Sequence, residues 1–145
     1  MTKEKFNITS ATQQEIADFT EKAWSVEDEE HFDEQVDWVR KDFIFKATQG
    51  EKIVGVITGE FEAGVTYIED LIVDKEMRRQ GIGKILVEEV EQLTKDKGGH
   101  KVFLFTMEEW GASRLYESLG YEITGNLPNH CLGRDFVIYS KNISE

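Results

Sequence analysis

The stretch Tyr67-Ile-Glu-Asp-Leu-Ile-Val-Asp-Lys-Glu-Met-Arg-Arg-Gln-Gly-Ile-Gly-Lys-Ile-Leu-Val-Glu-Glu-Val90 joins an apolar segment to a basic turn with two glycines and then to an amphipathic segment. The β-branched run from Ile68 to Val73 predicts a largely buried strand. From Ile82 onward apolar residues recur at spacings of three and four until Gly98, which predicts a helix beginning at the glycines. The sequence therefore predicts a strand, a turn and a helix in direct succession.

The junction between this strand and this helix suits an anion. The first amides of a helix have no partner inside it and carry the positive end of the helix dipole, which stabilises an exposed anion by roughly 0.3–1 kcal/mol. Gly81 and Gly83 have no side chain that would hold a phosphate away from these amides, and Arg78, Arg79 and Lys84 add positive charge. We expect a phosphate here; the alternative is that the glycines only turn the chain.

Two common nucleotide loops do not match this junction. A Walker loop places a hydroxyl residue after its lysine, whereas Ile85 follows Lys84. A dinucleotide fingerprint needs a third glycine where Leu86 stands, and the chain is not an alternating βαβ array. The junction is therefore neither a Walker loop nor a dinucleotide-binding fingerprint.

Two segments resemble one known family. Arg78-x-x-Gly81-x-Gly83 resembles the acetyl-CoA-binding motif of the GCN5-related N-acetyltransferase (GNAT) superfamily, Arg/Gln-x-x-Gly-x-Gly/Ala. Ala112-Ser-Arg-Leu-Tyr116-Glu-Ser-Leu-Gly-Tyr121 resembles that superfamily's Ala-x-x-Leu-Tyr helix followed by Gly-Tyr/Phe entering a strand. The resemblance spans residues 5–142 and implies a mixed α+β fold, with a mostly antiparallel sheet of six or seven strands, a splayed parallel pair and about four helices.

The resemblance also implies where acetyl-CoA, the co-substrate, would lie. Its pantetheine arm would pair with backbone on the motif strand, and its pyrophosphate would meet the amides of the glycine turn. Glu109 stands where the superfamily frequently has an asparagine that contacts the arm, and its neighbours are atypical too; Trp110 would line the channel or cover its edge. The implied cofactor-binding residues are Leu71, Ile72, Val73, Arg78, Arg79, Gln80, Gly81, Ile82, Gly83, Lys84, Glu109, Ala112 and Tyr116.

Acetyl transfer to an amine sets the requirements for catalytic groups. A primary amine with a pKa near 10.4 is neutral in about one molecule in two thousand at pH 7, so a base or a water relay must take its proton. The resemblance implies Tyr116 as the acid toward the departing thiolate, and a core role is the alternative. Some members carry a glutamate as base at the position of Leu104, which cannot accept a proton. We therefore predict Glu69 as the base, ahead of Asp70 and Glu108. Strand alternation would place Glu69 and Asp70 on opposite faces.

Length, charge and cysteine content limit the remaining possibilities. The 145 residues suit one domain, 1–145, with no linker and no apolar run that could cross a membrane. A net charge of −12, from 17 basic against 29 acidic residues, argues against nucleic-acid or anionic-membrane partners. One cysteine and no signal segment after Met1 predict a cytoplasmic protein.

The rest of the chain reads as alternating helix and hairpin patterns. Ser10 to Gln13 would cap a first helix, and residues 27–40 would form a second, acidic one. Residues 43–58 form a predicted hairpin that turns again at 62–64. Residues 102–107 would lie parallel to the motif strand, and Phe136 to Tyr139 would form the last strand. Superfamily members often dimerise through that strand, so a homodimer is possible on resemblance.

The acceptor is left open between several classes. A small cationic amine suits the acidic chain, although acidity also serves solubility. A protein N-terminus or lysine is the second acceptor class, and a non-catalytic acyl-CoA sensor is the alternative outside enzymes. No metal is expected, because the three histidines have no ligand spacing and His130 beside Cys131 is poor evidence for zinc.

Overall fold

The computed structural model describes residues 6–143. The chain divides into two compact units, one up to Asp37 and one from Trp38 onward. The first holds α1 and the second holds the sheet with α2 and α3. That residues 1–145 act as one domain stays a prediction, and Met1 to Lys5, where a signal segment would begin, lie outside the described residues.

The first unit is a single helix, α1 (Gln13–Phe32). Thr12 caps it, because the Thr12 hydroxyl accepts from the Glu15 amide while the Glu15 carboxylate accepts from the Thr12 amide. It ends at Asp33, whose left-handed backbone (φ 59°) lets its amide donate to the Glu29 carbonyl. The predicted second helix over 27–40 is wrong, because α1 continues unbroken through Glu27 to Phe32 and residues 33–40 contain no helix.

The second unit is built on one six-stranded sheet with the order β1-β2-β3-β4-β6-β5. The strands are β1 (Lys41–Gln49), β2 (Lys52–Glu62), β3 (Val65–Val73), β4 (Lys101–Thr106), β5 (Glu122–Leu127) and β6 (Phe136–Asn142). All pairs are antiparallel except β3 with β4. The predicted mixed sheet, the hairpin and the parallel pair are confirmed.

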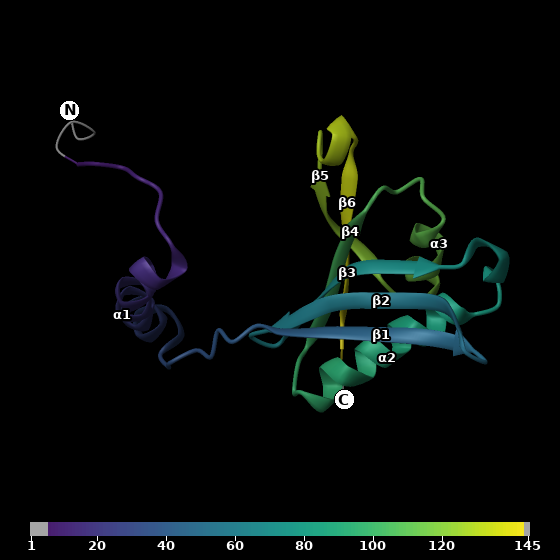
Figure 1. Cartoon of the computed structure of the whole chain (residues 1–145), viewed down its shortest axis with the longest axis horizontal. Coiled ribbons are helices and arrows are strands. Elements are labelled where there is room, and N and C mark those ends of the chain that lie inside the picture. The colour runs from purple at the N-terminus through teal and green to yellow at the C-terminus, as the bar shows by residue number, and fades with distance from the viewer. Residues whose placement is uncertain (1–5, 144–145) are drawn as a thin grey trace. The chain divides into compact units, whose positions relative to one another are not determined.

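The parallel pair β3 and β4 is short and splayed. Pairing runs only from Val65 opposite Lys101 to Tyr67 opposite Phe103. Beyond Tyr67 the two halves of the sheet diverge, and β4, β5 and β6 run across the direction of β1, β2 and β3 (Figure 1). The remaining length of β3 is therefore paired with β2 but not with β4.

A β-bulge marks the start of this divergence. Thr58 lies opposite Asp70 and the next residue, Gly59, lies opposite Ile68, so Glu69 is the extra residue. Gly59 has to be glycine, because a Cβ there would lie 2.0 Å from the Tyr67 carbonyl oxygen. The bulge interrupts the strict alternation of side chains along β3.

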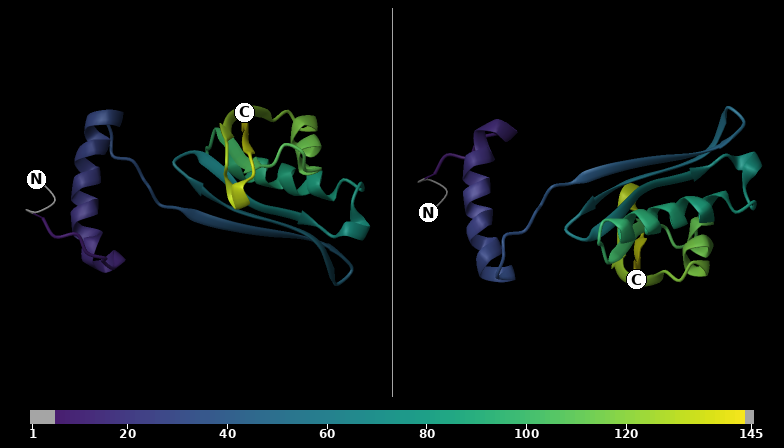
Figure 2. Two further views of the ribbon diagram at one scale, coloured as in Figure 1. Left: turned by 90° about the horizontal axis from the view of Figure 1, so that it is seen from above. Right: turned by 90° about the horizontal axis from the view of Figure 1, so that it is seen from below.

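One face of the sheet is covered by α2 (Ile82–Asp96), which lies along one side of β1, β2 and β3 in both views of Figure 2. Residues from both layers, including Ile57, Ile68, Val87 and Val90, form the core. The short α3 (Ala112–Ser118) packs on the β6 side through Tyr116 and Tyr139. Residues 6–143 thus contain three α-helices rather than about four, and none of them is long and apolar enough to cross a membrane.

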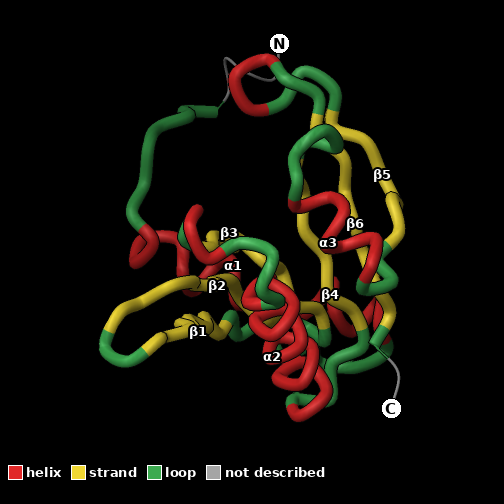
Figure 3. The backbone as a smooth tube through the Cα atoms, turned by 90° about the vertical axis from the view of Figure 1, so that its right-hand side faces the viewer, coloured by secondary structure: helices red, strands yellow, loops and turns green. Residues whose placement is uncertain are grey.

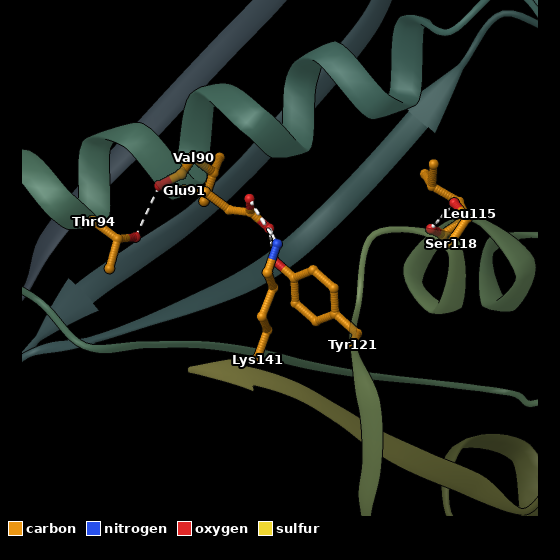
Figure 4. Close-up of polar contacts among 7 residues, drawn as sticks. All are labelled: Val90, Glu91, Thr94, Leu115, Ser118, Tyr121 and Lys141. Atoms are coloured by element: carbon orange, nitrogen blue, oxygen red, sulfur yellow. Dashed lines mark hydrogen bonds and ion pairs between the residues drawn. The ribbon is translucent and has the colours of Figure 1, made fainter. Parts of the chain in front are cut away.

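A polar cluster ties α2 to the last two strands. The Glu91 carboxylate accepts from the Tyr121 hydroxyl at 2.8 Å and from the Lys141 ammonium at 3.1 Å (Figure 4). Lys141 belongs to β6, which lies between β4 and β5. Both edges of this strand are therefore paired within the sheet, and a homodimer through residues 136–139 stays a prediction.

Candidate functional site

A cavity of about 750 Å³ opens where β3 leaves β4. Three segments surround it: the end of β3, the turn and first residues of α2, and the start of α3. In Figure 3 these segments lie near the divide between β3 and β4, the place where the two strands separate. Its lining residues are Leu71, Ile72, Val73, Met77, Arg78, Arg79, Gly81, Ile82, Gly83, Lys84, Trp110, Gly111, Ala112, Arg114 and Leu115.

The turn before α2 exposes the first amides of the helix to this cavity. A 3₁₀ turn, η2 (Lys75–Met77), leads from β3 into a backbone with positive φ at Arg79 (65°) and Gly81 (83°). Gly81 is the N-cap and supplies no side-chain hydrogen bond, so no cap side chain competes for the helix-start amides. Gly83 lies close to α3, because a Cβ there would be 3.0 Å from a Leu115 methyl group.

The charged residues that line the cavity are all cationic. They are Arg78, Arg79, Lys84 and Arg114. The Arg78 side chain is held against the wall, where its Nε donates to the Val73 carbonyl at 3.3 Å. The whole chain carries a net charge of −12, so the cavity is positively charged in an otherwise acidic protein.

The lining agrees with most of the residues that the sequence assigns to the coenzyme. The three that do not line it are Gln80, Glu109 and Tyr116. Gln80 donates to the Met77 sulfur, and Glu109 is exposed. Met77, Gly111, Arg114 and Leu115 were missed, although Arg114 and Leu115 lie inside the Ala112 to Tyr121 motif.

Tyr116 belongs to the core beside the cavity. Its side chain is 2 % exposed, and its ring packs against Tyr121 at 5.4 Å and Tyr139 at 6.1 Å between centroids. Burial raises the pKa of the Tyr116 phenol above its ordinary value near 10, so the hydroxyl stays protonated at neutral pH. Its neighbours Arg114 and Leu115 line the cavity, whereas Tyr116 does not.

A second, smaller pocket of about 320 Å³ lies on β2, β3 and β4. Its apolar wall contains Tyr67, whose ring stacks on Phe103 at 5.1 Å and on Phe105 at 5.6 Å. Glu60 and Glu62 form an acidic side of the same pocket, and Val65 completes it. We call this the outer pocket.

The charges of nearby carboxylates also affect the Tyr67 phenol. Burial raises the pKa of Tyr67, and the charges of Glu69, Asp70 and Glu60 raise it further. The Thr58 hydroxyl donates to Asp70 at 3.3 Å. The charges of Glu69 and Asp70 thus both contribute to the shift at Tyr67. The bulge at Glu69 interrupts the alternation from which opposite facing was predicted, and the facing of these two side chains stays a prediction.

Aromatic contacts connect the outer pocket with the larger cavity. Phe105 packs against Phe136 at 6.2 Å, and Phe136 packs against Trp110 at 5.8 Å. His130, in the loop before β6, sits edge-on to both phenylalanines at 5.2 Å. Since Trp110 lines the larger cavity, a continuous aromatic wall leads from one pocket to the other.

Among residues 6–143, no group of three or more His, Cys, Asp or Glu is arranged to hold a metal ion. Cys131 is free and exposed. The arrangement offers amides, cations and an open strand edge on one side, and aromatic rings with carboxylates on the other.

Comparisons with known proteins agree with this geometry. The chain is 36% identical over 92 residues to human N-acetyltransferase 8, covering 54% of this chain and 38% of that protein. The chain spans less than half the length of the curated relatives it matches.

Solved structures share the fold. An acetyltransferase from Bacillus cereus superposes with a TM-score of 0.74 at 22% identity, covering 96% of this chain and 99% of that one. A GNAT family acetyltransferase from Elizabethkingia anophelis with acetyl-CoA bound gives 0.63 at 21% identity, covering 68% and 74%. A model of the acetyltransferase (GNAT) family matches residues 10–121. With this match over most of its length, the chain belongs to the acetyltransferase (GNAT) family.

Proposed function

We propose that this protein is an acetyl-CoA-dependent N-acetyltransferase that acts on a primary amine by direct transfer. The observation that carries the proposal is the larger cavity, in which the unpaired amides at the start of α2 meet four cationic side chains and no carboxylate. Such a site favours a pyrophosphate. The relative with acetyl-CoA in its structure supports the same assignment.

The coenzyme arm would lie along the open edge of β3. Leu71, Ile72 and Val73 are paired with β2 on one side, and the pairing with β4 has already ended at Tyr67. Their second edge borders the cavity without a strand partner, and there the Val73 carbonyl accepts from Arg78. An extended pantetheine can pair there as an added strand would, and this places its thioester toward the divide between β3 and β4.

The reaction needs no covalent enzyme intermediate. The neutral amine nitrogen attacks the thioester carbonyl carbon and forms the C–N bond, and the C–S bond then breaks to release the thiolate. One proton leaves the nitrogen and one is delivered to the sulfur. We propose Glu69 as the base for the first proton, directly or through water, since it lies on the bulge beside the outer pocket.

Tyr116 is our proposal for the second proton. Its raised pKa keeps the phenol protonated, and α3 carries it immediately after Leu115, which lines the cavity. The same burial makes the tyrosinate costly, so we expect the phenol to act chiefly by hydrogen bonding to the developing thiolate. A small cationic amine is our first acceptor class, with a protein N-terminus or lysine second.

A non-catalytic acyl-CoA sensor is the competing function. The burial of Tyr116 and the exposure of Glu109 favour it, because both were expected to contact the coenzyme. Thiol release from acetyl-CoA with polyamines, aminoglycosides, amino acids and peptides separates the two. Turnover on one of these amines supports the enzyme, whereas tight coenzyme A binding without turnover on any of them would identify a sensor.

A further inference from the structure

The outer pocket combines two features that recognise organic cations. Tyr67, Phe103 and Phe105 supply an aromatic surface, and a cation near such ring faces is attracted to them. Glu60 and Glu62 supply carboxylates on the neighbouring strand. An aliphatic chain that ends in an ammonium group would find both an apolar wall and a counter-charge here.

A cation from the chain itself already contacts these carboxylates. Arg40, just before β1, places its Nε 3.5 Å from Glu60 and one terminal nitrogen 3.9 Å from Glu62. The Arg40 side chain is 59% exposed while the glutamates are near 30%, so the ion pairs are weak enough to be replaced. The guanidinium shows where a cationic group of a ligand would bind.

The outer pocket is also connected to the proposed base and to the larger cavity. Glu69, in the adjacent bulge, contributes its charge to the raised pKa of Tyr67. The rings of Phe105, Phe136 and Trp110 lead from the pocket to the larger cavity. An amine held at Glu60 and Glu62 by one end can therefore direct its other end past Glu69 toward the divide between β3 and β4.

Resting on the function proposed above, we propose that the outer pocket selects acceptors that carry a second cationic group. Glu60 and Glu62 bind the distal ammonium after it displaces Arg40, the aromatic rings hold the aliphatic segment, and the near amine is the one acetylated. Arg40 is thus an internal competitor of the substrate. The predicted substrate class is the aliphatic diamine or polyamine.

The test uses the full chain with acetyl-CoA and two probes, spermidine and n-butylamine. In Glu60→Gln/Glu62→Gln we expect the KM for spermidine to rise about five- to ten-fold, since two partly exposed charge contacts are lost, and the KM for n-butylamine to change less than about two-fold. Glu88→Gln/Glu122→Gln is the control, because it changes the net charge equally at exposed positions away from the pocket. Equal effects in both double variants would overturn the proposal.

Arg40→Ala supplies an independent arm with the opposite sign. We expect it to lower the KM for spermidine about two- to five-fold. Lys52→Ala is the matched control, because Lys52 and Asp74 form a comparable ion pair at 3.6 Å with exposures of 61% and 31%. An unchanged or raised KM in Arg40→Ala would contradict the displacement of Arg40.

Direct titration keeps this inference separate from the proposed function. Calorimetry with coenzyme A present should show spermidine binding that weakens in Glu60→Gln/Glu62→Gln by the same factor as the KM. If wild-type protein binds no spermidine, the inference fails even when other amines are acetylated. If spermidine binds at the pocket but coenzyme A does not bind to the protein, the proposed function fails instead.

Discussion

Arg114 is the one cationic residue among the four lining residues of the larger cavity that the sequence did not predict, and its contribution can be measured. It lies on the first turn of α3 and lines the cavity with Arg78, Arg79 and Lys84. We expect Arg114→Ala to raise the KM for acetyl-CoA about three- to ten-fold, because one charge contact to the coenzyme is lost while the fold is kept. Steady-state kinetics measures this. Arg134→Ala, at an exposed position outside the lining, should leave that KM unchanged.

For Tyr116 we expect a change in kcat rather than in the KM for acetyl-CoA. Tyr116→Phe keeps the ring that packs on Tyr121 and Tyr139, so we expect an intact fold and a kcat lowered about ten- to hundred-fold with little change in the KM for acetyl-CoA. Because burial raises the pKa of this phenol, wild-type kcat should show no loss from its ionisation below about pH 10. An unaltered kcat in the variant would assign Tyr116 to the core alone.

At the scale of elements, Glu91 connects α2 with β6 and with Tyr121. Its side chain is 14% exposed and that of Lys141 is 29% exposed, so removing one partner leaves the other with little compensation from water. We expect Glu91→Ala to lower the free energy of unfolding by about 2–3 kcal/mol, measured by urea denaturation. Glu89→Ala, at an exposed position on the same helix, should cost about 0.5 kcal/mol or less. Equal losses would show that the cluster contributes nothing specific.

The elements that the sequence predicted well are those with local signals. The helix after Gly81 and the hairpin at Gln49 to Lys52 follow from apolar spacing and turn residues, which act within a few positions. The bulge at Glu69 depends on the partner strand, where Gly59 leaves no room for a side chain. The facing of Glu69 and Asp70 could not be read from β3 alone for that reason. The outer pocket likewise needs three strands, and its residues have no motif in common.

The wrong helix over 27–40 has a related cause. The apolar residues Phe32, Val36 and Val39 follow helical spacing, but the left-handed backbone at Asp33 ends α1 there. Asp tolerates that conformation better than most residues, and no sequence signal at this position demanded it. The helical spacing of the apolar residues therefore predicted a helix beyond Phe32, where α1 ends.

At the scale of the whole molecule, buried tyrosines set the response to alkaline pH. Burial raises the pKa of Tyr116 and of Tyr121, the latter also through the charge of Glu91. In the unfolded chain both phenols ionise near pH 10. Their contribution to stability is therefore fully present below about pH 10 and is lost as the pH rises above it. Urea midpoints between pH 8 and 11 should fall, and less so in Tyr121→Phe; a flat profile would contradict the burial of these groups.

The central claim is that the glycine turn before α2 binds the coenzyme, and calorimetric titration of coenzyme A into wild type, Gly81→Asp and Gly50→Asp tests it most directly. Both glycines have positive φ and open space around a Cβ, so both variants place Asp at a left-handed backbone position, but of the two only Gly81 lines the cationic cavity. We predict that wild type and Gly50→Asp bind coenzyme A alike, and that Gly81→Asp raises the Kd at least about ten-fold. Absence of binding to wild type, or equal binding to all three proteins, would contradict the account.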